Sequence, residues 1–343
     1  MKVVVFKGVK DLVVDEVAVP RPADDEVLLK VNVCGVCGTD LHMWAGTNFE
    51  GAFPFIPGHE MVGSVVELGK KVTTLKVGDR VTGEPFIACR VCPVCRNGGI
   101  SAFCPKHRYY GFTKETGGGF AEYQVSPEER LFKVPDNVSD ETAALTEPIA
   151  VAYHAVWGRA GGAAPHDRIG VFGAGPIGLF AMSACLVSGA DVFVFEPSAY
   201  RQNLAAAMGA KNIIDPTRAD AVAKVMDLTD GLGLTKIIEC SGNAAAVAMS
   251  VDLVAVDGKI VLTGHPGTKV PIEIGKTIWK HASLAGSCGS PYFFPKALAF
   301  MSKGLVNFEK AISHRFPIQA AEKAFVLGNK GTESSKIMIY PAG

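Results

Sequence analysis

The sequence predicts an α/β protein in which a β-rich first part is followed by a doubly wound parallel sheet. Two observations carry this prediction. Short Val- and Leu-rich runs, broken by polar and proline-rich stretches, occupy residues 3–5, 12–19, 27–33, 61–68, 79–83 and 120–134; such runs are typical of strands joined by turns. Beyond residue 142 strands and helices alternate, which indicates βαβ units with helices on both faces of a parallel sheet.

The alternation begins with a helical stretch near residues 142–157 and a buried strand near 169–172. Strands are then expected at 191–196, 212–214, 236–240 and 259–263, and helices at 176–188, 199–208, 217–228 and 243–255. After about residue 288 the pattern ends. Helices near 294–303 and 318–327 and a last strand at 335–340 follow.

Length and composition restrict the class of protein. A chain of 343 residues suffices for about two domains. A formal net charge of zero argues against a nucleic-acid partner. No membrane span is expected, because no apolar run reaches about 18 residues. Lys7, Lys10 and Asp11 interrupt the first apolar stretch, so we expect no signal peptide and a cytoplasmic location.

Four cysteines share one loop, CRVCPVCRNGGISAFC. Three follow each other at two-residue gaps and the fourth comes soon after: Cys89, Cys92, Cys95 and Cys104. Four thiolates close a tetrahedral coordination sphere, so this pattern predicts a structural zinc site. Disulfides or free thiols are the alternative. Cys34 and Cys37 also spell C-x-x-C, but a redox pair normally opens a helix in a βαβ setting, so we disfavour that interpretation.

A second set of metal-type residues is scattered over three segments. GVCGTDLH contains Cys37, Thr39, Asp40 and His42, PGHE contains His59 and Glu60, and TEPIAVAYHA contains Glu147 and His154. A cysteine, a histidine and one or two carboxylates leave a coordination position open, as a catalytic zinc requires. A zinc ion lowers the pKa of a bound hydroxyl, and the alkoxide is the species that releases hydride. We interpret His154 as a packing or interface residue.

Gly173, Gly175 and Gly178 form G-x-G-x-x-G directly after a predicted strand and before a predicted helix. In this setting the glycines permit a tight turn, a close approach of a pyrophosphate and close helix packing. Glu196 ends the next strand, about 20 residues on, where a carboxylate binds the adenosine ribose hydroxyls of NAD. A 2′-phosphate of NADP would meet its charge, although Arg201, one helical turn away, could partly relieve the repulsion.

Together these motifs resemble the medium-chain, zinc-containing alcohol and polyol dehydrogenases over essentially the whole chain. The resemblance implies a GroES-like catalytic domain formed by residues 1–150 and 289–343. It also implies a Rossmann NAD-binding domain at 151–288, with the active site in the cleft between the two. A homotetramer is the expected assembly and a dimer the second expectation.

The resemblance also assigns roles. Cys37 and His59 ligate the catalytic zinc, and Glu60 and Glu147 complete its sphere directly or through water, in a division that the sequence leaves open. Asp40 supports the site, Thr39 bonds the substrate hydroxyl, and His42 passes the proton to solvent. The remaining assignments concern the cofactor: Pro176 and Ile177 lie under the dinucleotide, Arg201 lies near the ribose, and Lys336 lies near the pyrophosphate.

The sequence departs from the family pattern at two places, and it gives limited information on the substrate. Eight residues separate Cys95 from Cys104, where relatives usually have seven, and Gly38 replaces a phosphate-binding arginine of some relatives. The Glu147–Pro148 pair favours a polyol, sugar, cyclitol or vicinal diol, with an amino alcohol such as threonine as the alternative. A zinc-free quinone or enone reductase and a non-catalytic sensor are disfavoured, because both would lack part of the Cys/His/Glu set.

Overall fold

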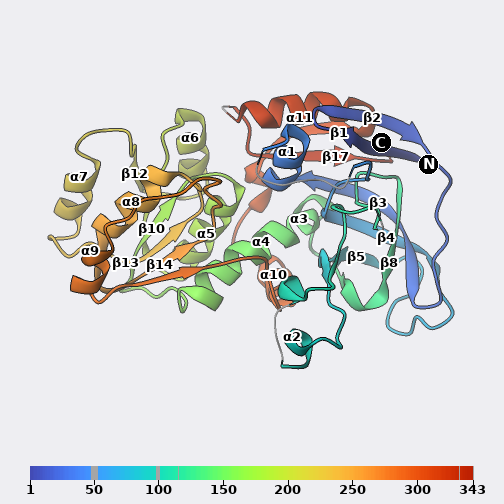
Figure 1. Cartoon of the computed structure of the whole chain (residues 1–343), viewed down its shortest axis with the longest axis horizontal. Coiled ribbons are helices and arrows are strands. Elements are labelled where there is room, and N and C mark those ends of the chain that lie inside the picture. Colours follow the sequence, from blue (N-terminus) through green and yellow to red (C-terminus); the bar gives the residue numbers. More distant parts are fainter. Residues whose placement is uncertain (48–52, 98–100, 115, 332, 343) are drawn as a thin grey trace. The chain divides into compact units, whose positions relative to one another are not determined.

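The computed structural model describes residues 1–47, 53–97, 101–114, 116–331 and 333–342 (Figure 1). The chain divides into two compact units. Unit 1 comprises Met1–Glu147, Phe294–Gly304 and Ile312–Gly343, and unit 2 comprises Pro148–Phe293 and Leu305–Ala311. The α/β class with a Rossmann-type parallel sheet is confirmed. None of the described helices is long and apolar enough to cross a bilayer.

Unit 1 is built on a seven-stranded sheet in the order β16-β17-β3-β4-β5-β9, with β8 also paired to β3. The long central strand β3 pairs antiparallel with β4, β8 and the C-terminal β17, so the C-terminal segment joins strands of the first part of the chain in one sheet. The strands of the sheet are β3 (Glu26–Val36), β4 (Glu60–Leu68), β5 (Arg80–Gly83), β8 (Tyr123–Pro127), β9 (Leu131–Lys133), β16 (Ile312–Pro317) and β17 (Lys336–Tyr340).

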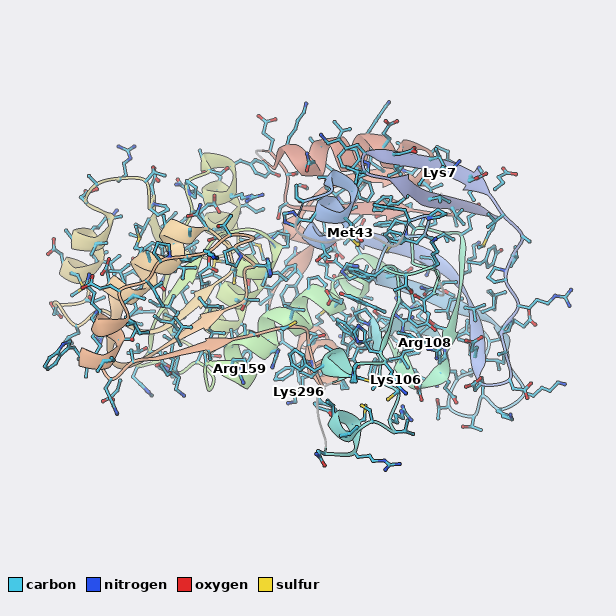
Figure 2. All side chains as sticks on the ribbon, in the orientation of Figure 1. Lys7, Met43, Lys106, Arg108, Arg159 and Lys296 are labelled. Carbon is cyan, nitrogen blue, oxygen red and sulfur yellow. The ribbon has the colours of Figure 1, made fainter. Side chains whose placement is uncertain are left out.

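Smaller elements complete unit 1. The hairpin β1 (Lys2–Gly8) and β2 (Asp11–Glu16) and the pair β6 (Phe86–Ile87) and β7 (Arg108–Tyr109) form two further sheets. Its helices are α1 (Gly38–Ala45), α2 (Pro93–Arg96), α3 (Asp140–Ala144), α10 (Phe294–Met301) and α11 (Ala321–Lys330), with 3-10 turns η1 (Ser101–Phe103), η2 (Glu128–Arg130) and η5 (Ile318–Ala320). Alternating residues of the strands bury an apolar core that also contains Met43 of α1 (Figure 2).

Unit 2 holds a six-stranded parallel sheet in the order β12-β11-β10-β13-β14-β15. Its central strands are apolar throughout and buried, as strands covered on both faces must be. In Figure 1, α5 and α6 lie on one side of this sheet and α7, α8 and α9 on the other. Its strands are β10 (Arg168–Phe172), β11 (Asp191–Phe195), β12 (Asn212–Ile214), β13 (Leu234–Glu239), β14 (Val254–Leu262) and β15 (Ser283–Gly286).

Four helices of unit 2 follow the predicted alternation, and a fifth, α9, was not predicted. They are α5 (Pro176–Val187), α6 (Ala199–Ala207), α7 (Ala221–Leu228), α8 (Ala244–Leu253) and α9 (Ile274–Trp279), with the 3-10 turn η4 (Phe308–Ala311). The helical stretch near 142–157 is divided into α3, α4 (Thr146–Tyr153) and the π-helical turn η3 (His154–Arg159). The change from unit 1 to unit 2 falls inside α4, between Glu147 and Pro148.

The structure differs from the sequence-based expectation in further places, among them strand β16, which was not predicted. Strand β15 was not expected, because its four residues are largely exposed and carry no apolar run. Helix α1 was also not expected, since its start depends on a cysteine rather than a usual capping residue. The return to unit 1 is not continuous from residue 289, because Leu305–Ala311 packs with unit 2. There Phe308 meets Phe180 of α5 edge to face at 5.6 Å.

Candidate active site

Cys37 sits at the start of α1, where β3 ends. Its backbone is extended, its sulfur accepts the Thr39 N–H at 3.5 Å, and its own N–H donates to the Asp40 carboxylate at 2.9 Å. This reciprocal capping satisfies two of the free N–H groups at the start of the helix. The thiol is thereby held at one position, partly accessible.

His59 and Glu60 approach the same place from the start of β4. Glu60 pairs in register with Gly35 of β3, two residues before Cys37. His59 and Glu60 are 3% and 1% exposed. One ligand atom from each of Cys37, His59 and Glu60 lies within 4.8 Å of the others. Strand pairing therefore brings Cys37 to His59 and Glu60, which are neighbours in the sequence but lie far along the chain from Cys37.

The second ring nitrogen of His59 faces a carboxylate. His59 Nδ1 lies 3.5 Å from Asp40 Oδ1, and neither atom has a hydrogen-bond partner among the described residues. Burial lowers the pKa of His59, but the charges of Asp40 and Cys37 outweigh burial and raise the pKa well above its usual value. Asp40 thus has the contact expected of a carboxylate that orients a metal-ligating histidine.

Glu147 belongs to this group electrostatically. It lies in the first turn of α4 and is 7% exposed. Burial raises the pKa of Glu147 to about 7; the charge of His59 opposes this shift and that of Glu60 reinforces it. The structure does not bring Glu147 into the three-residue ligand group, so the division of roles between Glu60 and Glu147 stays open.

Lys336 contacts this site through Glu60, a partner that the sequence did not predict. It is 2% exposed, and its ammonium donates to Glu60 Oε1 at 2.7 Å, to Glu60 Oε2 and to the Val36 carbonyl at 3.1 Å. These three acceptors match the three ammonium hydrogens. In the free protein Glu60 is thus the buried partner of Lys336, which its position on the last strand alone could not reveal. The role of Lys336 near a pyrophosphate stays a prediction.

The donor set fits a metal cation. The region combines a thiol, an imidazole, three carboxyl groups and one ammonium group: Cys37, His59, Asp40, Glu60, Glu147 and Lys336. Thiolate, imidazole and carboxylate together are the usual ligands of an open zinc site. The Cys/His/Glu group is compatible with catalytic zinc.

Thr39 and His42 lie on α1 beyond Cys37. The Thr39 hydroxyl is 3.7 Å from the Cys37 sulfur. His42 is exposed in the last turn, with its Nδ1 2.8 Å from the Thr47 hydroxyl. A spacing of three residues places Thr39 and His42 on the same side of the helix. The proton path predicted between them stays a prediction.

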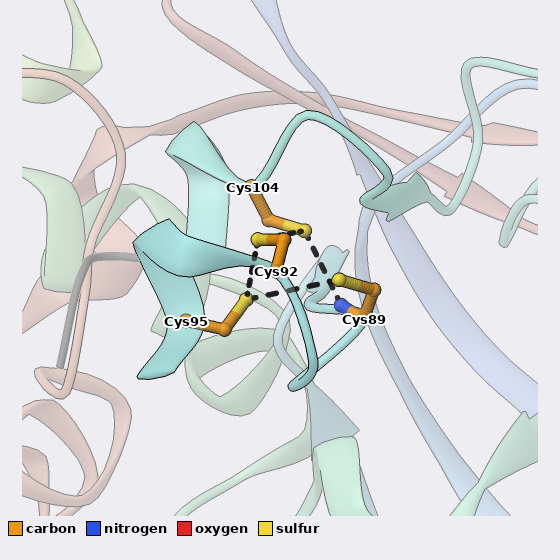
Figure 3. Close-up of side chains that lie close together, drawn as sticks. All are labelled: Cys89, Cys92, Cys95 and Cys104. Carbon is orange, nitrogen blue, oxygen red and sulfur yellow. Dashed lines mark hydrogen bonds between the residues drawn. The ribbon is translucent and has the colours of Figure 1, made fainter. Parts of the chain in front are cut away.

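The four cysteines of the loop meet around a common centre (Figure 3). Their sulfur–sulfur distances are 3.4 Å for Cys92–Cys95, 3.8 Å for Cys92–Cys104 and 4.0 Å for Cys89–Cys95. Four Zn–S bonds of about 2.3 Å in a tetrahedron give edges of about 3.8 Å. Backbone N–H groups of Val91 and Cys92 lower the pKa of Cys89 to about 6, which favours its thiolate. This cluster is compatible with structural zinc.

The glycine turn in unit 2 has the geometry that a dinucleotide requires. Gly173 has φ 89°, and a Cβ on Gly178 would lie 1.8 Å from the Gly173 carbonyl oxygen. A Cβ on Gly175 would meet nothing within 4 Å, so the backbone there is open to a ligand. Gly175 caps the start of α5, and Pro176 and Ile177 follow in its first turn. Free N–H groups at this helix start favour phosphate.

Glu196 and Arg201 line a cavity of about 500 Å³ beside this turn, together with Gly173, Gly175, Ser241 and Asn243. Glu196 accepts the Ala174 N–H at 2.8 Å and the Ser198 N–H at 2.9 Å, one on each oxygen. Each carboxylate oxygen keeps a further lone pair for a ligand hydroxyl. Arg201 Nε is buried without a hydrogen-bond partner among the described residues.

His154 has a structural environment in unit 2. Its Nδ1 lies 2.9 Å from the Gly289 carbonyl and 3.4 Å from the Ser287 hydroxyl, and its ring is 5.5 Å from that of Phe293. Burial lowers the pKa of His154. These contacts agree with the interpretation of His154 as a packing residue.

Fold and site define a zinc-binding oxidoreductase with a dinucleotide-binding unit. The family profile described as "Alcohol dehydrogenase GroES-like domain" matches residues 23–136, and that described as "Zinc-binding dehydrogenase" matches residues 176–303. An L-threonine 3-dehydrogenase of Caldanaerobacter subterraneus subsp. tengcongensis is 34% identical over 335 residues, covering 94% of this chain and 93% of that protein. A D-arabitol-phosphate dehydrogenase of Enterococcus avium is 33% identical over 94% of this chain and 92% of that protein.

A solved structure from Sinorhizobium meliloti 1021, described as a zinc-binding dehydrogenase bound to NADP, has a TM-score of 0.91 and 30% identity, covering 99% of both chains. The present chain belongs to the zinc-dependent medium-chain alcohol and polyol dehydrogenase family. The family prediction made from the motifs is confirmed. The reaction class of the family is oxidation of a secondary alcohol; the substrate of this chain is not determined by these comparisons.

Proposed function

We propose that this chain oxidises a secondary alcohol of a polyol, sugar, cyclitol or vicinal diol to the ketone with NAD, using a zinc ion held by Cys37 and His59 with Glu60 or Glu147. The observation that carries the proposal is the group of a partly accessible Cys37 with the buried His59 and Glu60, whose ligand atoms lie within 4.8 Å of each other. A zinc ion there would supply a Lewis acid for the substrate oxygen.

The chain's own residues orient this site and move the proton. Asp40 faces His59 Nδ1 and fixes which ring nitrogen is free for the metal. Thr39 is placed to accept the proton of the substrate hydroxyl while it passes its own proton on toward His42. His42, exposed at the end of the same helix, releases that proton to solvent, because an imidazole titrates near neutral pH.

The preference for NAD over NADP rests on Glu196. A second negative charge about 4 Å from this carboxylate would cost up to roughly 4 kcal/mol at an effective dielectric near 20. The unpartnered Nε of Arg201 in the same cavity acts in the opposite direction and reduces that penalty. We expect the ratio of kcat/KM for NAD over NADP to exceed one.

Replacing Glu196 tests this cofactor assignment. In Glu196→Gln the ratio should fall by at least tenfold, chiefly through a lower KM for NADP. Arg201→Gln should change the ratio in the opposite direction. A wild-type enzyme that prefers NADP would contradict the proposed role of Glu196, and an unchanged ratio in Glu196→Gln would contradict it equally.

The polyol-type substrate is supported by the Glu147–Pro148 pair and by the resemblance to an arabitol-phosphate dehydrogenase. Similarity to a threonine dehydrogenase supports the second candidate, an amino alcohol such as threonine. The test measures NADH formation by its absorbance. Its rate would be compared across polyols, cyclitols, vicinal diols, sugar acids and threonine. Threonine oxidation with kcat/KM at least tenfold above every polyol would reverse the order of the two candidates.

Metal analysis tests the zinc roles directly. Protein purified without chelators should contain about two zinc ions per chain. One would occupy the closed four-cysteine site and the other the open Cys37/His59 site. Cys37→Ser should contain about one and lose activity with every alcohol, and Cys95→Ser should lose the other ion. Metal-free protein that is fully active would refute the mechanism.

Location and assembly complete the proposal. We place the enzyme in the cytoplasm, where its thiols stay reduced, as a homo-oligomer with a tetramer favoured over a dimer. Light scattering coupled to size exclusion would distinguish these assemblies, and a monomer at micromolar concentration would contradict the assignment.

A further inference from the structure

A continuous series of aromatic rings runs through unit 1 from the four-cysteine loop to His59. Phe86 stacks on Tyr109 at 4.0 Å with an interplanar angle of 21°, and Tyr109 stacks on Phe112 at 3.6 Å and 10°. Phe112 then contacts the His59 ring at 4.7 Å and 47°. At the other end, His107 meets Phe86 at 5.6 Å, edge to face. We call His107, Phe86, Tyr109 and Phe112 the aromatic column.

The first end of the column is attached to the cysteine loop by backbone. His107 is three residues beyond Cys104; its backbone N–H and its Nδ1 both approach the Cys104 carbonyl, at 3.0 and 2.6 Å. A carbonyl only accepts, so Nδ1 carries the proton. Phe86 lies three residues before Cys89, and β6 and β7 pair Phe86 directly with Tyr109. Phe86 and Tyr109 therefore form a paired base where the chain enters and leaves the cysteine segment.

The other end acts on the imidazole of His59. One ring nitrogen faces Asp40, and Cys37 also contacts the ring, so the orientation in the ring plane is set by polar neighbours. Rotation of the ring about the line between those neighbours is not restrained by them. Phe112 packs on the ring from the side, and Tyr109 stands behind Phe112. The column supplies the restraint that the polar contacts lack.

The column is distinct from the main core of unit 1. Phe112 is only partly buried at the edge of that core, and Tyr109 is half-buried and outside it. Stacked pairs of this kind contribute beyond the area they bury, and their geometry is specific. Filling the core does not require four aromatic rings in a row. Here the row of rings ends on His59, a candidate metal ligand.

We propose that Phe112 and Tyr109 are positioning residues for His59, and that through them the four-cysteine loop is coupled to the open metal site. The proposal rests on the role of His59 as a metal ligand under the proposed function. Its consequence is that filling the structural site raises the metal affinity of the catalytic site, although the two sites share no ligand.

The test compares Phe112→Leu with Phe316→Leu. Phe316 is likewise a partly buried phenylalanine packed on the same core, but its ring partner is His314. Zinc affinity of the catalytic site is measured by chelator competition, with Cys37→Ser and Cys95→Ser assigning the two release steps. Phe112→Leu should weaken the catalytic site about three- to tenfold, the size of one aromatic contact, and leave the four-cysteine site unchanged. Phe316→Leu should change neither affinity.

A second readout detects geometry rather than affinity. With cobalt in the catalytic site, the visible d–d bands of Phe112→Leu should shift or broaden relative to wild type, whereas Phe112→Tyr should restore them. The coupling is measured by a double-mutant cycle: Cys95→Ser should weaken the catalytic site, and in the Phe112→Leu background it should weaken that site at least threefold less.

Equal losses of affinity in Phe112→Leu and Phe316→Leu, or unchanged cobalt bands, would show that Phe112 has only a packing role. If the effects of Cys95→Ser and Phe112→Leu on zinc affinity were additive in the double-mutant cycle, the two metal sites would not be coupled through Phe112. These outcomes differ from failure of the proposed function: protein that binds cobalt normally yet oxidises no alcohol contradicts the activity, not the column.

Discussion

Replacing Lys336 by methionine should destabilise unit 1 strongly, because it leaves the carboxylate of Glu60 buried without its partner. At 2.7 Å between Nζ and Oε1, the attraction is about 6 kcal/mol at an effective dielectric near 20, and desolvation of both ions offsets much of it. Breaking one side of such a pair typically costs about 3–5 kcal/mol. For a unit of this size we expect a loss of about 6–20 °C in Tm.

The assay is thermal unfolding of metal-free protein followed by near-UV circular dichroism. Lys71→Met is the matched control, because Lys71 pairs with Asp24 at 3.3 Å but both side chains are more than half exposed. Such a surface pair contributes about 0–1 kcal/mol. The double variant Lys336→Met with Glu60→Gln should recover most of the loss, since the amide that replaces the Glu60 carboxylate carries no charge to be left unpaired.

A loss in Lys336→Met no larger than that in Lys71→Met would refute the reasoning, because Glu60 would then have to be solvated or protonated in the folded protein. No recovery in the double variant would refute it too. In that case the loss would come from the packing of the lysine chain rather than from its charge.

Two further predictions concern unit 2. Gly178→Ala should weaken NADH binding at least a hundredfold, because its Cβ would lie 1.8 Å from the Gly173 carbonyl oxygen; fluorescence titration checks this, and Gly175→Ala, where no atom lies within 4 Å in the free protein, should retain its melting temperature. Burial opposes ionisation of Asp167, but hydrogen bonds from Lys236 and Thr235 outweigh it and lower the pKa of Asp167. The stability that ionised Asp167 contributes to the fold is therefore fully present above the pKa of the residue in the unfolded chain, near 3.9. This stability is lost as pH falls through the lower pKa of Asp167 in the folded protein. The Tm difference between wild type and Asp167→Asn should shrink below about pH 4, and a constant difference down to pH 2 would contradict this assignment.

Sequence periodicity was sufficient for the parallel sheet of unit 2. Strands buried on both faces are apolar along their whole length, and Gly173, Gly175 and Gly178 mark the turn that follows the first of them. Strand β15 escaped detection, because an edge strand with exposed side chains lacks that signal. Its place in the sheet depends on backbone pairing with β14, which leaves no trace in composition.

Motif spacing likewise identified the four-cysteine loop, since its ligands lie close in the chain and local backbone can bring them together. The open site differs, because the register of β3 with β4 brings Cys37 together with His59 and Glu60, whereas Glu147 on α4 is not part of that ligand group. Their residue types indicated zinc chemistry, but only pairing showed which of them meet.

The sequence by itself therefore determined the class of fold, the family, the two kinds of metal-type residue and the glycine turn, because each depends on residues within one segment or on residue type. Tertiary structure alone decided the partner of Lys336 and the aromatic column beside His59. Both contacts join segments that are far apart in the chain. Lys336 pairs with Glu60, and Tyr109 and Phe112 pack toward His59. Long-range pairing of this kind is set by strand register and burial, which no local pattern encodes.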